Sequence, residues 1–157
     1  MQYPGYNSGK VILSEGKWFP FRIHNLIQLQ DDAWYYVLED VNGLKHFLPA
    51  EHYEKYGFNI GAEITCKIDR INCTGRIFLE PKHPFYKEGE IYSFEVISYM
   101  KKGDEGILTI KDILDKCIEV PVCGNENREQ ISKNWVSCII KSIIKGNLIL
   151  EIIHINS

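Results

Sequence analysis

The sequence predicts an all-β protein that contains two tandem copies of one small five-stranded barrel. Three observations support this prediction: an internal repeat, a pattern of short strand-like runs, and the order of those runs within each copy. The repeat comes first because a missed repeat leads to the wrong fold for the whole chain. The runs are rich in β-branched and aromatic residues, and turns containing glycine, asparagine or proline separate them.

The internal repeat relates the segment that begins at Gly16 to the segment that begins at Gly89. The offset between matching residues drifts from 73 to 71 along the chain, as small changes in loop length would make it do. Residues of the same type coincide in order at several columns: Phe21 with Phe94, Asp40 with Asp112, Pro49 with Pro121, Cys66 with Cys138, and Glu80 with Glu151. Because coincidence does not explain so many ordered matches, two tandem domains are expected.

The repeat places a first barrel over residues 10–82 and a second, degenerate barrel over residues 90–157, with a linker over residues 83–89 between them. Barrels of about 70 residues can fold alone. The prolines at 81 and 84 stiffen the join, because each fixes φ and biases the residue before it towards extended conformations. The join is either a plain spacer or a stiff one that limits how the barrels can be oriented.

The residue pattern predicts the first three strands of the first copy. Alternating apolar and polar residues predict a strand over residues 19–24, and aromatic and β-branched residues predict a second strand over residues 34–39. An Asn-Gly turn at residues 42–43 leads into a third strand over residues 44–48. The second and third strands should therefore form a hairpin.

A short helix is expected next, over residues 49–57, because proline stands at its start and glycine at its end. Two more strands, over residues 62–72 and 76–80, complete the copy. Three strands, a short helix and two strands is the order of the OB-fold, a partly open Greek-key barrel. Proteins with this fold bind ligands on the second and third strands, so the predicted hairpin is where a ligand is expected.

The second copy repeats the five strands but not the helix. Its strands are expected over residues 91–100, 106–113, 116–120, 135–144 and 147–153. The polar stretch 123–130 stands where the helix should be. This stretch is interpreted either as a degenerate helix or as a mobile loop.

Charge and composition narrow the classes of function. The net charge of −3, from 18 basic and 21 acidic side chains, argues against tight non-specific binding to nucleic acid but allows a local basic patch. No apolar run approaches the roughly 18 residues of a membrane span. The first residues also lack the pattern of a signal peptide. We therefore expect a cytoplasmic protein with no membrane partner.

The sequence predicts neither a catalytic centre nor a metal or cofactor site. The five cysteines have no Cys-x-x-Cys spacing, which favours structural thiols over metal ligands. The five histidines are scattered. No nucleophile elbow, phosphate loop or zinc-binding helix motif is present in the sequence. A non-catalytic protein without a cofactor is therefore expected.

Short motifs in the first copy resemble the RNA-binding repeat named after ribosomal protein S-one. The Gly-Leu-Lys-His at residues 43–46 is similar to the Gly-Leu-x-His of that repeat, and the Asp-Arg at 69–70 and Gly-Arg-Ile at 75–77 resemble its signatures around the last hairpin. In that family an aromatic residue on the second strand, the histidine, the aspartate and the arginine contact RNA. The resemblance implies these roles for the following residues: Trp34 or Tyr36, His46, Asp69 and Arg76.

Both copies depart from the pattern of that family. The first copy has Lys45 where the family usually has an aliphatic residue. The second copy has Ile118 in place of His46 and Asn147 in place of Arg76. An RNA-binding face is therefore expected in the first copy.

Strand parity gives an independent view of which side chains face solvent. Matching Tyr35 and Val37 to apolar residues of the second copy predicts that these two point into the barrel, and that Trp34 and Tyr36 point outwards. The same matching predicts that His46 points inwards, whereas the resemblance implies that it faces RNA. The sequence leaves this conflict open.

Aromatic and basic side chains on neighbouring strands favour a platform for nucleic acid, because bases stack on aromatic faces while cations hold the phosphates. The predicted site in the first barrel comprises Trp34, Tyr36, Lys45, His46, Phe47, Asp69, Arg70 and Arg76. The expected partner is single-stranded RNA or DNA, with RNA favoured. The alternative interpretation of the aromatic residues is that they pack against the other domain or cap a barrel end. The alternative function is a protein–protein interaction or scaffold module, in which the barrels dock onto another protein or onto a larger nucleic-acid machine.

Overall fold

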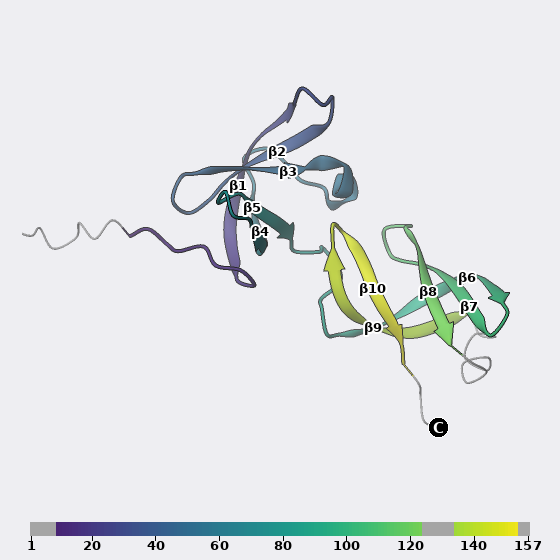
Figure 1. The fold of residues 1–157 in the computed structure, drawn as a ribbon. Coiled ribbons are helices and arrows are strands. Elements are labelled where there is room, and N and C mark those ends of the chain that lie inside the picture. Colours follow the sequence, from purple (N-terminus) through teal and green to yellow (C-terminus); the bar gives the residue numbers. More distant parts are fainter. Residues whose placement is uncertain (1–8, 124–133, 154–157) are drawn as a thin grey trace, which may run out of the picture. The chain divides into compact units, whose positions relative to one another are not determined.

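The computed structural model describes residues 9–123 and 134–153. Apart from Cys123, the polar stretch predicted to be a degenerate helix or a loop lies outside the described residues. The chain divides into two compact units, Met1–Lys82 and His83–Ser157, and each is described by itself. Strands make up most of the regular structure in both units (Figure 1).

The predicted all-β class is confirmed, with two sheets of five strands each. The first sheet contains β1 (Trp18–Gln28), β2 (Trp34–Glu39), β3 (Lys45–Pro49), β4 (Glu63–Ile71) and β5 (Ile77–Pro81). The second contains β6 (Ile91–Lys102), β7 (Glu105–Lys111), β8 (Cys117–Cys123), β9 (Trp135–Ile144) and β10 (Asn147–Ile152). The strand orders are β3-β2-β1-β4-β5 and β10-β9-β6-β7-β8, so the two sheets share one topology. The outer strands of each sheet contact each other, which gives the predicted OB-fold barrel in both units.

The first strand of each barrel is the longest, and it serves two neighbours. The N-terminal half of β1 pairs with β4 and its C-terminal half pairs with β2, with a shift in register between Ile23 and Asn25. In the second barrel, β6 pairs with β9 and β7, and its register shifts between Val96 and Ser98. A bulge bends a strand and breaks its two-residue alternation. The alternation in the sequence therefore indicated only the part of β1 that precedes the bulge.

The short helix predicted over residues 49–57 consists of two 3₁₀ turns, Ala50–His52 and Glu54–Tyr56. Tyr53 separates the turns because its ring enters the barrel, where only 2% of the residue is exposed. Its hydroxyl donates a hydrogen bond to the buried Glu80 carboxylate at 3.1 Å. Gly57 then ends the segment with φ at 73°, in the left-handed region that favours glycine. The segment thus closes one end of the first barrel.

Each barrel has its own hydrophobic core. The core of the first barrel is formed by Phe21, Ile23, Leu38, Leu48, Tyr53, Cys66, Ile68 and Leu79. The core of the second includes Phe94, Leu108, Ile110, Val120, Val136, Cys138, Ile140 and Leu148. The matched cysteines are buried free thiols, and burial raises the pKa of Cys138 to about 11. The thiols therefore pack as small apolar groups in the two cores.

The parity predicted for β2 is wrong, and that predicted for His46 is right. Tyr36 and Leu38 pack against the core of the first barrel, whereas Tyr35 lies on the outer face against Phe47. The error arose from applying the offset of 73 residues too far along the chain. The registers Leu26↔Tyr36 and Tyr99↔Leu108 show that the offset changes in the loop before β2, and a slip of one residue reverses every side chain of a strand.

The same turn joins the second and third strands of both barrels. In the first barrel, Asp40 Oδ1 accepts hydrogen bonds from the amides of Asn42 and Leu44 at 2.8 and 3.0 Å. In the second barrel, Asp112 Oδ1 accepts them from Leu114 and Lys116 at 2.8 and 2.9 Å. An aspartate that bonds the following amides stabilises a turn, which gives a structural reason for the match between the two aspartates.

The segment expected as a linker, residues 83–89, packs against the second barrel. His83 is buried, and the ring of Tyr86 lies 5.4 Å from that of Phe94 in the core. Glu88 Oε1 accepts a hydrogen bond from the amide of Ile143 at 2.9 Å.

Among the described residues, the structure contains no helix with the length and hydrophobicity that a membrane span requires.

Candidate nucleic-acid interface

A cleft of about 650 Å³ opens on the first barrel between the β2–β3 hairpin, the loop after β1 and the β4–β5 turn. Six of the side chains that line it carry its chemistry or shape it: Leu29, Tyr35, Lys45, His46, Phe47 and Arg76. We call this site the aromatic–basic cleft. It lies where proteins with this fold bind oligonucleotides, on the second and third strands and beside the loops that flank them.

Two aromatic rings form one wall of the aromatic–basic cleft. Tyr35 and Phe47 project from adjacent strands, and their ring centroids are 6.2 Å apart at an interplanar angle of 75°. Phe47 is 45% exposed, so much of its ring surface is open to solvent. The Tyr35 hydroxyl donates a hydrogen bond to the Asp31 carboxylate at 2.7 Å, which orients the ring. This bond raises the pKa of Tyr35 and lowers that of Asp31.

Two basic side chains line the aromatic–basic cleft as well. Lys45 begins β3, and Arg76 ends the β4–β5 turn; both are exposed. Asn72 shapes this turn, because its Oδ1 accepts hydrogen bonds from the amides of Thr74 and Arg76 at 3.1 and 2.8 Å. The turn thus holds the backbone of Arg76 at the edge of the cleft, opposite the hairpin that carries Lys45.

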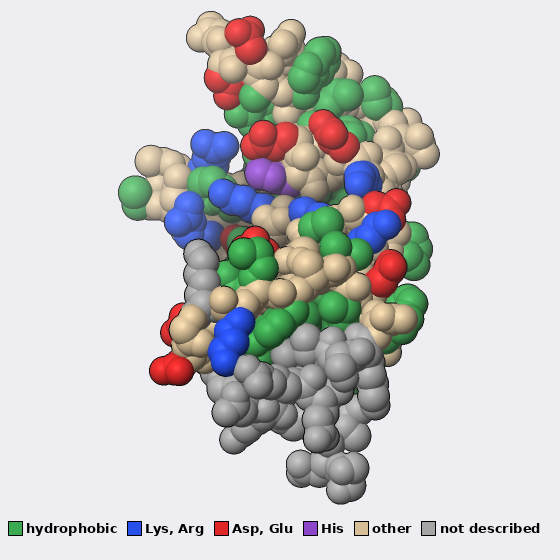
Figure 2. All heavy atoms as spheres, turned by 90° about the vertical axis from the view of Figure 1, so that its right-hand side faces the viewer, with side chains coloured by type: hydrophobic (Ala, Val, Ile, Leu, Met, Phe, Trp, Pro, Cys, Tyr) green, Lys and Arg blue, Asp and Glu red, His purple; other side chains and the backbone are tan. Residues whose placement is uncertain are grey.

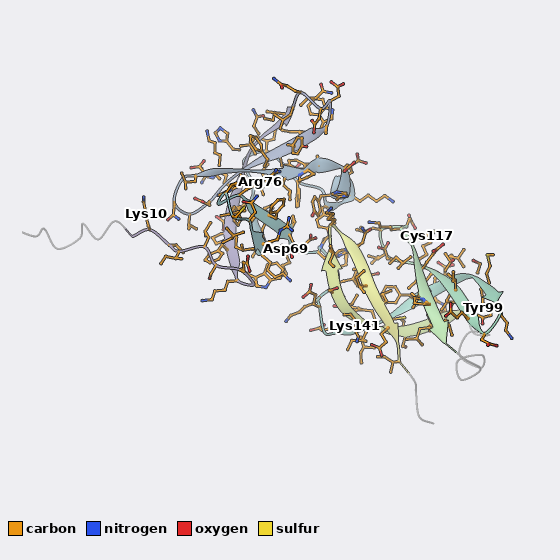
Figure 3. All side chains as sticks on the ribbon, viewed as in Figure 1. Lys10, Asp69, Arg76, Tyr99, Cys117 and Lys141 are labelled. Atoms are coloured by element: carbon orange, nitrogen blue, oxygen red, sulfur yellow. The ribbon has the colours of Figure 1, made fainter. Side chains whose placement is uncertain are left out.

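The basic surface extends from the cleft along the β4–β5 hairpin. The guanidinium groups of Arg70 and Arg76 both lie over the ring of Phe78, at 4.5 and 4.9 Å from its centroid. A register shift between Ile68 and Arg70 places Arg70 directly opposite Phe78. Asp69 is the extra residue of this bulge; it is exposed and is not among the residues that line the cleft. Figure 3 labels Asp69 and Arg76 on the first barrel.

His46 points towards the barrel interior. Its Nε2 lies 2.7 Å from Oδ2 of the buried Asp40, and its ring packs edge-on against Phe21 at 6.1 Å. Burial alone would raise the pKa of Asp40, but hydrogen bonds from His46 and from two backbone amides hold it below the usual value. His46 therefore anchors the β2–β3 turn beneath the cleft, in the orientation that strand parity predicted.

The two predicted aromatic residues of β2 lie outside the aromatic–basic cleft. Tyr36 is directed into the barrel, where its ring contacts Phe58 at 5.4 Å. Trp34 is 51% exposed at the start of β2, but it does not line the cleft. The aromatic residue of β2 that lines the cleft is therefore Tyr35, not the predicted Tyr36.

Sequence reasoning missed two aromatic residues of this surface, Tyr35 and Phe78. The match of Asp40 with Asp112 could have identified Tyr35. If its offset is applied to the preceding residues, Leu38 aligns with Ile110, and strand alternation then directs Tyr35 outwards. Phe78 alternates with Ile77 and Leu79, which pack on the core side. Alternation therefore indicated that Phe78 faces out, but only the bulge brings Arg70 opposite it.

The second barrel has different residues at the positions that match the cleft. Ile107 matches Tyr35, Cys117 matches Lys45, and Glu119 matches Phe47. Asn147 matches Arg76. At these four positions, the first barrel has two aromatic rings and two cations, and the second barrel has neither.

No family model matches the chain, and no curated protein matches its sequence. Among solved structures, a similar one is the cytoplasmic molybdate-binding protein ModG, in a crystal form with molybdate bound. The match has a TM-score of 0.31 at 15% identity, and it covers 89% of this chain and 98% of that chain. Similarity this weak transfers neither a ligand nor an activity, so the strand topology and the geometry of the cleft are the basis for a functional assignment.

Proposed function

We propose that this chain is a non-catalytic module that binds single-stranded nucleic acid, RNA in preference to DNA, in the aromatic–basic cleft of its first barrel. The observation that carries the proposal is that one cleft, on the ligand-binding face of the fold, is lined by the contacting rings of Tyr35 and Phe47 and by two cations, Lys45 and Arg76. The motifs that resemble the S-one repeat support RNA as the preferred ligand.

The chemistry of the cleft suits unpaired bases. A base stacked on an aromatic side chain contributes about 1–3 kcal/mol, and this interaction tolerates many sequences. A cleft of about 650 Å³ falls within the range of about 300–1,000 Å³ typical of ligand pockets. An unstacked base can therefore insert beside Phe47 while its phosphates approach the two cations.

The proposed activity requires no proton transfer. Binding by stacking and charge neutralisation uses only rings and cations, and Nε2 of the cleft histidine, His46, is already hydrogen-bonded to Asp40. We therefore infer that the chain recruits or holds nucleic acid and does not cleave it.

Fluorescence anisotropy with a labelled single-stranded oligonucleotide at low salt tests the proposal. We expect Phe47→Ala to weaken binding by about ten-fold or more, in line with the loss of one stacking surface. The matched control is Trp135→Ala, which removes an exposed aromatic residue from the second barrel and should leave the affinity unchanged. Equal affinities for the parent protein and for Phe47→Ala would refute the role of the cleft.

A protein-interaction module is the second candidate. Large apolar side chains are exposed on both units, among them Leu44 and Ile60 on the first and Met100 and Ile113 on the second. Figure 2 shows such side chains between charged ones on one face. Pull-down before and after nuclease treatment separates the two candidates. Partners that survive the nuclease favour protein binding, whereas loss of every partner favours nucleic acid.

A further inference from the structure

We propose that the second barrel carries a separate binding site for an organic cation, a guanidinium or alkylammonium group. The site is a hollow of about 490 Å³. Four aromatic residues and three carboxylates line it, among them Tyr86, Tyr92, Trp135, Glu95, Asp112 and Asp115. We call it the Trp135 pocket. It goes beyond the proposed function, because its charge is opposite to that of the aromatic–basic cleft.

Carboxylates dominate the charge of the Trp135 pocket. Glu95, Asp112 and Asp115 face one cation among the lining residues, Lys111. The Lys111 ammonium already pairs with Asp115 at 2.9 Å. Lys111 also lies opposite Glu95 in the β6–β7 register. One cation against three carboxylates leaves an excess of negative charge in the lining, which attracts a cationic ligand and repels a phosphate.

Asp112 supplies a buried acceptor at this site. The residue is 5% exposed, and its Oδ1 accepts the two amide hydrogen bonds of the β7–β8 turn. Its Oδ2 is buried and has no hydrogen-bond partner among the described residues. Buried carboxylate oxygens normally have a donor, because an unpaired one is costly. A ligand with N–H groups would bring that donor.

The first barrel shows what is missing in the second. There the matching carboxylate, Asp40, bonds His46 through Oδ2 at 2.7 Å. The residue that matches His46 in the second barrel is Ile118, which packs against the core and offers no donor. The repeat thus kept the aspartate and lost the histidine on the third strand that bonds it, although the buried His83 lies near enough to Asp112 to interact with its charge.

A hollow at the matching place on the first barrel is smaller, about 250 Å³, and carries its own guanidinium. Arg22 lies there at the position that Glu95 occupies in the second barrel, and Glu63 at the position of Trp135. In the second barrel Glu95 replaces this arginine, Lys111 replaces Glu39, and Trp135 replaces Glu63. Both linings therefore hold three carboxylates and one cation, and the second differs by offering an aromatic face to a cationic ligand.

The aromatic wall is placed to hold such a cation. Trp135 is 59% exposed and stands directly opposite Glu95 in the β6–β9 register. Tyr86, which lines the same pocket, packs edge-on against Tyr92, with ring centroids 4.9 Å apart. A guanidinium or ammonium group is attracted to the face of an aromatic ring when it lies within about 6 Å of the ring centroid. A carboxylate beside the ring adds charge-assisted hydrogen bonds.

Titration of the ¹⁵N-labelled full chain, followed by two-dimensional NMR, tests this proposal. The chain has three tryptophans, and the Trp135→Phe variant assigns the indole N–H signal of Trp135. The probes are agmatine and a short peptide with one arginine. The controls are the same peptide with citrulline, which is isosteric but neutral, and sodium chloride at equal ionic strength.

We expect both guanidinium probes to move the Trp135 indole signal saturably, and the citrulline peptide and the salt to leave it in place. Glu95→Gln should weaken binding at least about three-fold, from the loss of one charge partner. Glu39→Gln, in the smaller hollow of the first barrel, is the matched control and should change nothing. Equal responses to arginine and citrulline, or no saturable response, would overturn the proposal.

Two further comparisons complete the test. Agmatine that binds as tightly as the arginine peptide indicates a free small cation as the ligand, whereas a peptide that binds at least about ten-fold tighter indicates an arginine side chain of a protein partner. Phe47→Ala should keep the full response of Trp135. Failure of oligonucleotide binding at the aromatic–basic cleft would therefore not overturn the cation site. Failure of cation binding at the Trp135 pocket would likewise not overturn the proposed nucleic-acid binding.

Discussion

The pairing of His46 with Asp40 decides what this histidine contributes to the first barrel. Its Nε2 lies 2.7 Å from a buried carboxylate oxygen, so the ring stabilises the β2–β3 turn. The resemblance to the S-one repeat implied a histidine that touches RNA, whereas strand parity implied one that points inwards. Parity was the better guide because it reads the local geometry of this chain.

The buried His83 should make stability depend on pH. Its Nδ1 accepts hydrogen bonds from the amides of Phe85 and Tyr86, so it stands unprotonated. Burial lowers the pKa of His83, and the nearby Asp112 carboxylate opposes this shift without cancelling it. The unfolded chain, with the ordinary value of 6.5, therefore binds the proton more tightly than the folded chain. The contribution of His83 to stability is complete above pH 6.5 and is lost as the pH falls towards the lower pKa of the folded state.

We expect the unfolding temperature to fall as the pH drops below the ordinary histidine value of 6.5, and His83→Asn to reduce this slope. Asparagine keeps a side-chain acceptor but does not titrate. Thermal unfolding followed by circular dichroism at a series of pH values measures the effect. An unchanged slope in His83→Asn would assign the pH dependence to other groups.

At the scale of the elements, glycine allows the close contact between β6 and β7. Gly106 is buried opposite Lys101 in the register, and a Cβ at its position would lie 2.4 Å from the Tyr99 hydroxyl oxygen. The atoms Cε2 and Cζ of the same ring would lie at 2.6 and 2.7 Å, so the whole ring would have to move. Figure 3 labels Tyr99 on the second barrel.

Gly106→Ala should therefore destabilise the second barrel by about 1–3 kcal/mol through overpacking. In a Tyr99→Ala background the same change should cost much less, because the clashing ring is gone. Urea unfolding of the parent, both single variants and the double variant gives the coupling free energy. Additive effects in this cycle would show that the two side chains do not compete for space.

The elements also show where sequence reasoning succeeded and where it failed. Eight of the ten strands lie within two residues of their predicted ranges, because glycine turns and β-branched runs mark them locally. The exceptions are β1, which continues four residues beyond the predicted end at residue 24, and β8, which continues three residues beyond the predicted end at residue 120. The bulge after Ile23 interrupts the alternation of β1, and the change of offset in the following loop reversed the predicted faces of β2. Both errors come from insertions that depend on pairing with another strand.

At the scale of the whole molecule, the charges of the two barrels differ in their distribution. The net charge is −3, yet Lys45, Arg70 and Arg76 lie around or beside the aromatic–basic cleft of the first barrel. Among the charged residues that line the Trp135 pocket of the second barrel, three are carboxylates and one is a lysine. The acidic total therefore conceals a local cationic surface.

Oligonucleotide binding should accordingly depend on salt, but only modestly. Each neutralised phosphate of a single strand contributes about −0.7 to the slope of log K against log salt, so three cations predict a slope of about −2. Arg76→Ala should make the slope shallower by about 0.7. Anisotropy titrations over a range of salt concentrations measure both values. A slope near zero in the parent protein would exclude the cations from binding.

The sequence by itself determined the repeat, the all-β class, the strand order and the segments that carry the rings and cations, because these depend on local pattern and on matches along the chain. Only the tertiary structure decided which ring of β2 faces solvent, that Arg70 and Arg76 share Phe78, and that Asp112 lacks the partner that Asp40 has. The physical reason is that side-chain direction in a strand alternates residue by residue. Bulges and loop lengths, set by pairing between distant strands, therefore control which side chains meet at a site.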